Sequence, residues 1–138
     1  MEGVHLPISY NYSKFLFYSS FSMLISTLIA IYMNDTYITV YFLLLFLSSI
    51  NYWRKPEYGL RRNIDLLIVK IGVLIVLSQI CLLKNEFCRY IYTCLAFCSL
   101  IFYIIEHILV YMLNVKWIIF HMAIHLYMSL SALFIIFN

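Results

Sequence analysis

Five long apolar runs, separated by short polar connections, fill almost the whole chain of 138 residues. After a short tail over residues 1–14, we expect helices over residues 15–33, 37–52, 64–83, 90–113 and 115–137. A helix rises about 1.5 Å per residue, so about 20 residues cross the roughly 30 Å hydrocarbon core of a bilayer. The second run is the shortest and is only marginally long enough. The pattern predicts a membrane-spanning helical bundle with no room for a separate water-soluble domain.

The composition indicates that lipid surrounds these apolar runs. Hydrophobic residues make up 65% of the chain and charged residues 11%, whereas about 25% of an ordinary soluble domain is charged. A transmembrane β-barrel is excluded, because its strands would be segments of about ten residues with alternating polarity. Short connections favour antiparallel packing of consecutive helices. The expected fold is an all-α, up-and-down bundle that forms one transmembrane domain over residues 1–138.

The basic residues indicate how the bundle is oriented. Of the basic residues, only Lys84 and Arg89 fall on the side opposite the N-terminus. Lys70 lies within the third run, and its side chain is expected to snorkel to the inner interface. The residues on the N-terminal side are Lys14, Arg54, Lys55, Arg61, Arg62 and Lys116. Because cytoplasmic ends are rich in Lys and Arg, we expect the N-terminus in the cytoplasm and the C-terminus outside or in a lumen. A net charge of +3 without a basic stripe argues against nucleic-acid binding.

The four cysteines, Cys81, Cys88, Cys94 and Cys98, lie on or beside the third and fourth runs. Their separations match no zinc-finger pattern, which favours buried apolar thiols over metal ligands. A disulfide between Cys81 and Cys88 stays open as an alternative if their connection faces an oxidising lumen.

The last run carries two histidines on one face. His121 and His125 are four residues apart, and Ser129 and Ala132 continue the same stripe, which is expected to face the bundle interior. Two imidazoles at this spacing can bind one metal ion, but a zinc site needs at least a third protein ligand. In the alternative interpretation, which we favour, both histidines are packed and hydrogen-bonded to neighbouring helices.

Other polar residues are expected at a similar depth. Asp65 either caps the third helix in its first turn or faces inward, and Glu106 either reaches the interface or pairs with another helix. The residues within about 10 Å of the inner helix ends are Ser48, Ser49, Asp65, Glu106, His107 and His121. They form either a functional cluster or a chance grouping near the interface, where polar residues cost least.

The connection between the second and third runs is the densest in polar and aromatic residues. Trp53, Arg54, Lys55, Arg61 and Arg62 suit a membrane-interface loop that faces anionic lipid headgroups. In the simplest interpretation, this loop anchors the protein and fixes its topology.

The sequence here resembles the superfamily of membrane hydrolases that includes alkaline ceramidases and adiponectin-type receptors. In those seven-helix proteins a Ser, a His four residues later and an Asp that opens the next helix meet an H-x-x-x-H pair on the last helix around zinc. Ser49, Asp65, His121 and His125 match this pattern. The resemblance implies a zinc-dependent hydrolase in which Ser49 stabilises an oxyanion and Asp65 acts as a base or orients one.

This chain departs from that superfamily at two points. Trp53 stands where the first zinc-binding His is expected, and the chain has five apolar runs where the superfamily has seven helices. His107 would supply the missing ligand only if its helix turned it inward. The block from Ser49 to Asp65 also resembles small uncharacterised membrane proteins of large DNA viruses and protists, which implies no function.

Three functions follow, in order of preference. The first is a non-enzymatic protein that organises a membrane or a membrane complex, with the bilayer and a membrane protein as partners. The second, implied by the resemblance, is a divergent hydrolase of a lipid amide or ester, with zinc held by His121, His125 and His107. The third is a small channel or proton-conducting bundle that uses Glu106 and the histidines as a relay.

Overall fold

The computed structural model describes residues 10–57 and 59–136, apart from the side chains of Tyr10 and Val76. Within these residues the chain forms helices and no strand of a sheet, as the sequence predicts. The helices are α1 (Tyr10–Ser19), α2 (Phe21–Tyr32), α3 (Thr36–Trp53), α4 (Leu60–Leu82), α5 (Glu86–Tyr111) and α6 (Trp117–Ile136).

Five segments of the described residues are long and apolar enough to cross a membrane. Four of them are α3, α4, α5 and α6, and the fifth is Asn11–Tyr32, which joins α1 to α2. The backbone of Ser20 between them stays in the right-handed helical region, and both its N–H and its hydroxyl donate to Leu16 O. The predicted all-α multi-span fold is confirmed.

Several helices extend beyond their apolar runs. The first span starts about five residues earlier than predicted, α4 starts at Leu60 instead of residue 64, and α5 starts at Glu86 instead of residue 90. Polar side chains explain part of this extension, because they satisfy the free backbone N–H groups of a first turn. Asn85 accepts hydrogen bonds from Phe87 N and Cys88 N in this way. Apolar length therefore marks the hydrocarbon core and not the helix ends.

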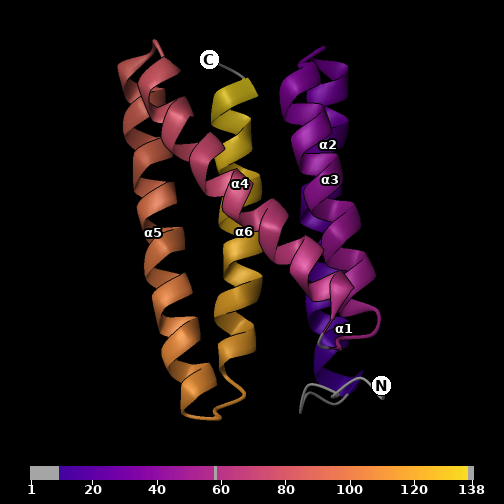
Figure 1. Ribbon diagram of the computed structural model, residues 1–138. Helices are drawn as coiled ribbons and strands as arrows, with labels where there is room; N and C mark the ends of the chain where they lie inside the picture. Colours follow the sequence, from indigo (N-terminus) through magenta and orange to yellow (C-terminus); the bar gives the residue numbers. More distant parts are fainter. Residues whose placement is uncertain (1–9, 58, 137–138) are drawn as a thin grey trace.

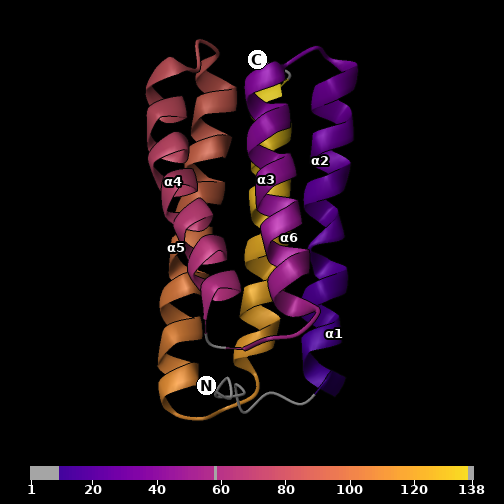
Figure 2. The same cartoon turned by 45° about the vertical axis from the view of Figure 1, so that its right-hand side comes forward.

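Helix α6 lies in the middle of the bundle. Figure 1 shows α5 on one side of α6 and α2 with α3 on the other, and α6 contacts α1, α2 and α5. Helix α4 crosses in front of α6 at an incline. It is joined to α5 at one end and lies beside α3 at the other, as Figures 1 and 2 both show. The expected hairpins form at α2–α3, α3–α4 and α5–α6, whereas α4 and α5 diverge from their joined ends and contact each other little.

The buried core follows α3 and the helices packed against it. The larger cluster is formed by Met23, Ala30, Ile38, Tyr41, Phe42, Leu45, Phe46 and Ala132. A second cluster lies near the N-terminal end of the bundle and contains Leu16, Tyr52, Trp53 and Ile118. Many large apolar side chains of α4 and α5 stay exposed, which suits lipid or another membrane helix.

All four cysteines are free thiols. The alternative of a Cys81–Cys88 disulfide is therefore wrong: Cys81 is exposed on α4, whereas Cys88 is partly covered in the first turns of α5. The expectation of buried thiols also fails for Cys81 and Cys94, because both lie on outward faces where lipid replaces a protein neighbour.

Candidate functional site

Asp65 lies inside the bundle, where α3 and α4 meet. The hydroxyls of Ser48 and Ser49 both donate to the same oxygen, Asp65 Oδ1, at 2.8 and 2.9 Å. All three side chains are buried. Asp65 is the sixth residue of α4, whose N-cap position is Gly59, so the capping alternative for Asp65 is wrong. The short α3–α4 turn instead positions it to tie its helix to α3.

Glu106 and His121 join α5 to α6. Glu106 Oε1 lies 2.9 Å from His121 Nδ1, and the Glu106 residue is only 9% exposed. Of the two alternatives for Glu106, the structure shows the partnership with another helix. The α3 helix that carries Ser48 and Ser49 also carries Trp53, whose ring lies 5.0 Å from that of His121, so both pairs lie in one region near the N-terminal end of the bundle.

The Trp53 indole lies against these histidines. Its ring centroid is 5.0 Å from that of His121 at an interplanar angle of 75°, and the His121 and His125 rings are 4.7 Å apart at 73°. Trp53 is the last residue of α3 and is only 5% exposed. Its predicted place in the interface loop is therefore wrong, because α3 continues through Trp53 and turns its ring onto α6.

His125 connects α6 to the first span. Its Nδ1 lies 2.8 Å from Ser19 Oγ, and its backbone carbonyl accepts from Ser22 and Ser129. Ser129 also donates to Ser22 Oγ at 2.9 Å, and Ser26 donates to Ser129 O at 3.1 Å. The inward stripe of histidines and serines on α6 is thus confirmed, with hydrogen bonds between helices.

Sequence reasoning missed the hydroxyls on the first span. Ser19, Ser22 and Ser26 are spaced three and four residues apart, which places them on one helix face and is the signal that predicts their role. Ser19 and Ser22 also line a surface groove of about 260 Å³ together with Met122, Ala123 and Leu126. The groove is open at the surface of the bundle and reaches the polar side chains of Ser19 and Ser22.

The side chains do not fit the zinc centre that the resemblance implies. Among residues 10–57 and 59–136, no three His, Cys, Asp or Glu side chains lie close enough together to hold a metal ion. Trp53 offers no ligand atom, and His107 is exposed and bonded to Tyr103 O of its own helix at 3.1 Å. The structure brings Ser49 to Asp65 and His121 to His125, but it brings no third ligand to the histidines.

The basic loop after α3 lies at the end of the bundle. Arg54 and Lys55 are exposed, and Lys55 Nζ forms an ion pair with Glu57 at 2.9 Å. Arg61 and Arg62 are half-buried at the start of α4. Arg54 is therefore exposed without an ion pair among the described residues, whereas the other three cations are paired or partly covered.

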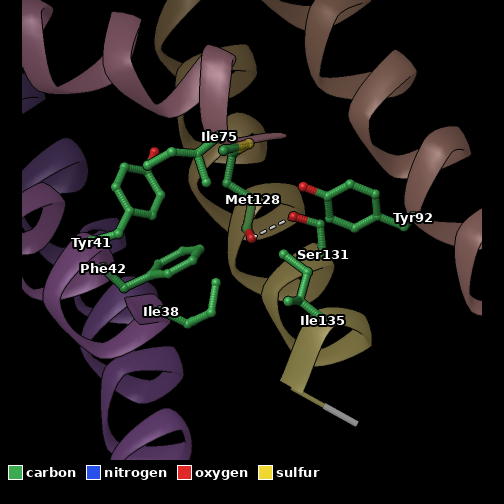
Figure 3. A pocket seen from close by; sticks show the side chains of 8 residues that line it. All are labelled: Ile38, Tyr41, Phe42, Ile75, Tyr92, Met128, Ser131 and Ile135. Carbon is green, nitrogen blue, oxygen red and sulfur yellow. Dashed lines mark hydrogen bonds between the residues drawn. The ribbon is translucent and has the colours of Figure 1, made fainter. Parts of the chain in front are cut away.

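A small enclosed space lies between α3, α4, α5 and α6 (Figure 3). Its volume is about 10 Å³, and its lining is mainly apolar with the hydroxyls of Tyr41, Tyr92 and Ser131. The Tyr41 hydroxyl is buried without a hydrogen-bond partner among the described residues. It points toward Gly72 of α4, where a side chain would collide with the Tyr41 ring. Gly72 therefore allows α4 to approach α3 closely.

These features define a multi-pass helical bundle in which the buried acids and His125 are hydrogen-bonded to side chains of other helices. Comparison with known proteins found no matching family model, no matching curated protein and no matching solved structure.

Proposed function

We propose that this chain is a non-enzymatic multi-pass membrane protein that organises a membrane or a membrane-protein complex. One observation carries the proposal: each buried acid or histidine in the described part of the chain is hydrogen-bonded to a side chain of another helix. Asp65 is bonded to α3, Glu106 to α6 and His125 to α1. A catalytic base must instead reach a substrate or water. The hydrogen bonds of these groups hold neighbouring helices together, which supports the scaffold function.

The outer surface supports the same function. Helices α4 and α5 bury little of their length and present large apolar side chains around most of their circumference. Within a bilayer such faces contact lipid or the helix of another protein. Hydrogen bonds between helices in the interior and apolar outward faces on α4 and α5 together support a membrane scaffold.

We further propose that the N-terminus is cytoplasmic and the C-terminus lies outside or in a lumen. The α3–α4 and α5–α6 connections lie at the end where α1 begins, and the α4–α5 connection lies at the other (Figure 1). The first end holds Lys14, Arg54, Lys55, Arg61, Arg62 and Lys116, and the second holds Lys84 and Arg89. The excess of basic residues supports this orientation, with Arg54 facing anionic headgroups.

Two measurements test the scaffold function. In native membranes solubilised with a mild detergent, the 16.5 kDa chain should migrate in an assembly heavier than one chain in its micelle. The purified protein should release no fatty acid from a panel of lipid amides and esters, with or without added zinc. A monomer in native membranes would overturn the proposal, and so would hydrolysis that is lost in Asp65→Asn.

A second candidate is proton conduction, favoured by one specific arrangement. Glu106, His121, His125 and Ser19 form a chain of contacts at 2.9 Å, 4.7 Å between ring centroids and 2.8 Å. Proton relays use such chains of acids and histidines. The chain covers only part of the length of α6, which is why this function ranks second. Voltage-driven proton uptake into liposomes that Glu106→Gln abolishes would support it, and uptake that persists in Glu106→Gln would exclude this relay.

A further inference from the structure

Lys70 is a charged side chain near the middle of a span. It is the eleventh of the 23 residues of α4, about 15 Å along the helix from Leu60 at the usual rise. Its side chain is exposed, and in the described part of the chain it makes no hydrogen bond and no ion pair. Intramembrane cations almost always face the interior of a bundle or pair with an acid. Lys70 does neither within this chain.

Lys70 belongs to a continuous stripe along the outer face of α4, here called the α4 stripe. Its members, at alternating spacings of four and three, are Asn63, Leu67, Lys70, Leu74, Leu77 and Cys81. All six are exposed, and Leu67, Leu74 and Leu77 are 58%, 67% and 56% exposed. Apolar residues at a heptad spacing form the seam that packs against a second helix, and one polar residue in the seam specifies its partner and register.

We propose that the α4 stripe binds a transmembrane helix of another protein that carries a carboxylate facing Lys70. This inference rests on the proposed scaffold function and names the partner of that scaffold. Lys70 can snorkel to the inner interface while the stripe faces lipid, but a helix packed over the stripe would remove its ammonium group from water. A carboxylate on that helix would then offset the cost of burying the charge. Helix α4 is free to accept a neighbour, because it contacts α3 at one end and diverges from α5 toward that end.

A second copy of this chain does not fit the stripe. Two copies share one orientation in the membrane, so a symmetric contact through α4 would place the two Lys70 ammonium groups at the same depth. Two of the three acids within the described spans are also engaged, since Asp65 is bonded to two serines and Glu106 to His121. The third, Glu86, is the first residue of α5 and lies at the end of its span, away from the depth of Lys70. The complementary carboxylate therefore comes from a different protein.

The test uses the full-length protein in phosphatidylcholine vesicles and a fluorescent leucine-rich transmembrane peptide as the probe. The peptide carries one Glu at the depth of Lys70, and a matched peptide carries Gln. Energy transfer from labelled protein should report binding of the Glu peptide that is about tenfold tighter than that of the Gln peptide. Lys70→Leu should abolish this preference and Lys70→Arg should keep it. Circular dichroism of each variant checks the fold.

Several results would overturn the inference. They are equal binding of the two peptides, a preference that survives Lys70→Leu, and self-association of the protein that excludes the peptide. A signal that requires anionic lipid would assign Lys70 to a headgroup and would equally overturn it. The native assembly size separates this inference from the scaffold function. A heavy assembly that persists in Lys70→Leu removes the α4 stripe as its basis but leaves the scaffold, whereas a monomeric native protein removes the scaffold.

Discussion

Glu106 on α5 and His121 on α6 are joined by a 2.9 Å hydrogen bond, and their side chains are only 11% and 20% exposed. In hydrocarbon, interhelical polar pairs contribute about 0.6 kcal/mol on average and at most about 1.7 kcal/mol. A double-mutant cycle of Glu106→Leu and His121→Leu should give a coupling within this range. The measurement is the free energy of unfolding in bicelles. The same cycle with His107→Leu is the control and should give no coupling, because His107 bonds to its own helix.

Either Ser48 or Ser49 should be able to hydrogen-bond Asp65 when the other is replaced. Because both hydroxyls donate to Asp65 Oδ1, Ser48→Ala or Ser49→Ala alone leaves the carboxylate one donor and should cost below about 1 kcal/mol of unfolding free energy. The double variant leaves the buried acid without either donor and should cost more than the sum of the two. Simple additivity would contradict this interpretation. Ser78→Ala, exposed on α4, is the control and should be nearly neutral.

Gly72→Ala should lower the free energy of unfolding of the bundle by about 1 to 3 kcal/mol, because the alanine methyl group would collide with the Tyr41 hydroxyl and ring. Tyr41→Phe alone should cost little, since that hydroxyl is buried without a partner. Combined with Gly72→Ala, it should recover part of the loss by removing the atom nearest the new methyl group. Thermal unfolding of the four proteins gives the values. No recovery in the double variant would show that α3 and α4 pack differently.

Trp53→His should create a zinc site, which residues 10–57 and 59–136 of the natural sequence do not form. The indole ring lies 5.0 Å from that of His121, and the His125 ring lies 4.7 Å from His121, so a third imidazole would complete a ligand set. Elemental analysis of purified protein should find near-stoichiometric zinc in Trp53→His and not in the natural protein or Trp53→Phe. Adding His125→Ala should remove the metal. Stoichiometric zinc in the natural protein, lost on His121→Ala, would instead favour the hydrolase.

The orientation can be tested with two exposed lysines at opposite ends. In a background without cysteine, Lys84→Cys should react with a membrane-impermeant maleimide on intact cells. Lys55→Cys should react only after permeabilisation, because Lys55 lies at the proposed cytoplasmic end. The reverse pattern would place the N-terminus outside.

Much of the fold could be predicted from hydrophobicity alone, because each span must satisfy its backbone within one helix and be long enough for the bilayer. The inward faces of His125 and Ser129 were also predictable, since polar groups avoid lipid, whereas the sequence left open whether Asp65 faces inward or caps its helix. The neighbouring helix that each group contacts could not be predicted. Helical spacing fixes a face and not its neighbour, so neither the bond from His125 to Ser19 nor the contact of Trp53 with His121 could be derived from the sequence.

Membrane proteins are made from one end to the other, and the polar contacts of this bundle join parts of the chain that are made far apart in time. Ser19 contacts His125 across 106 positions, and Glu106 contacts a histidine on the last helix. Until α6 enters the bilayer, the acid on α5 and the hydroxyls on the first span lack their partners from it. A chain that stops before α6 therefore leaves the Glu106 carboxylate in the bilayer without its His121 partner, where an unpaired acid is costly.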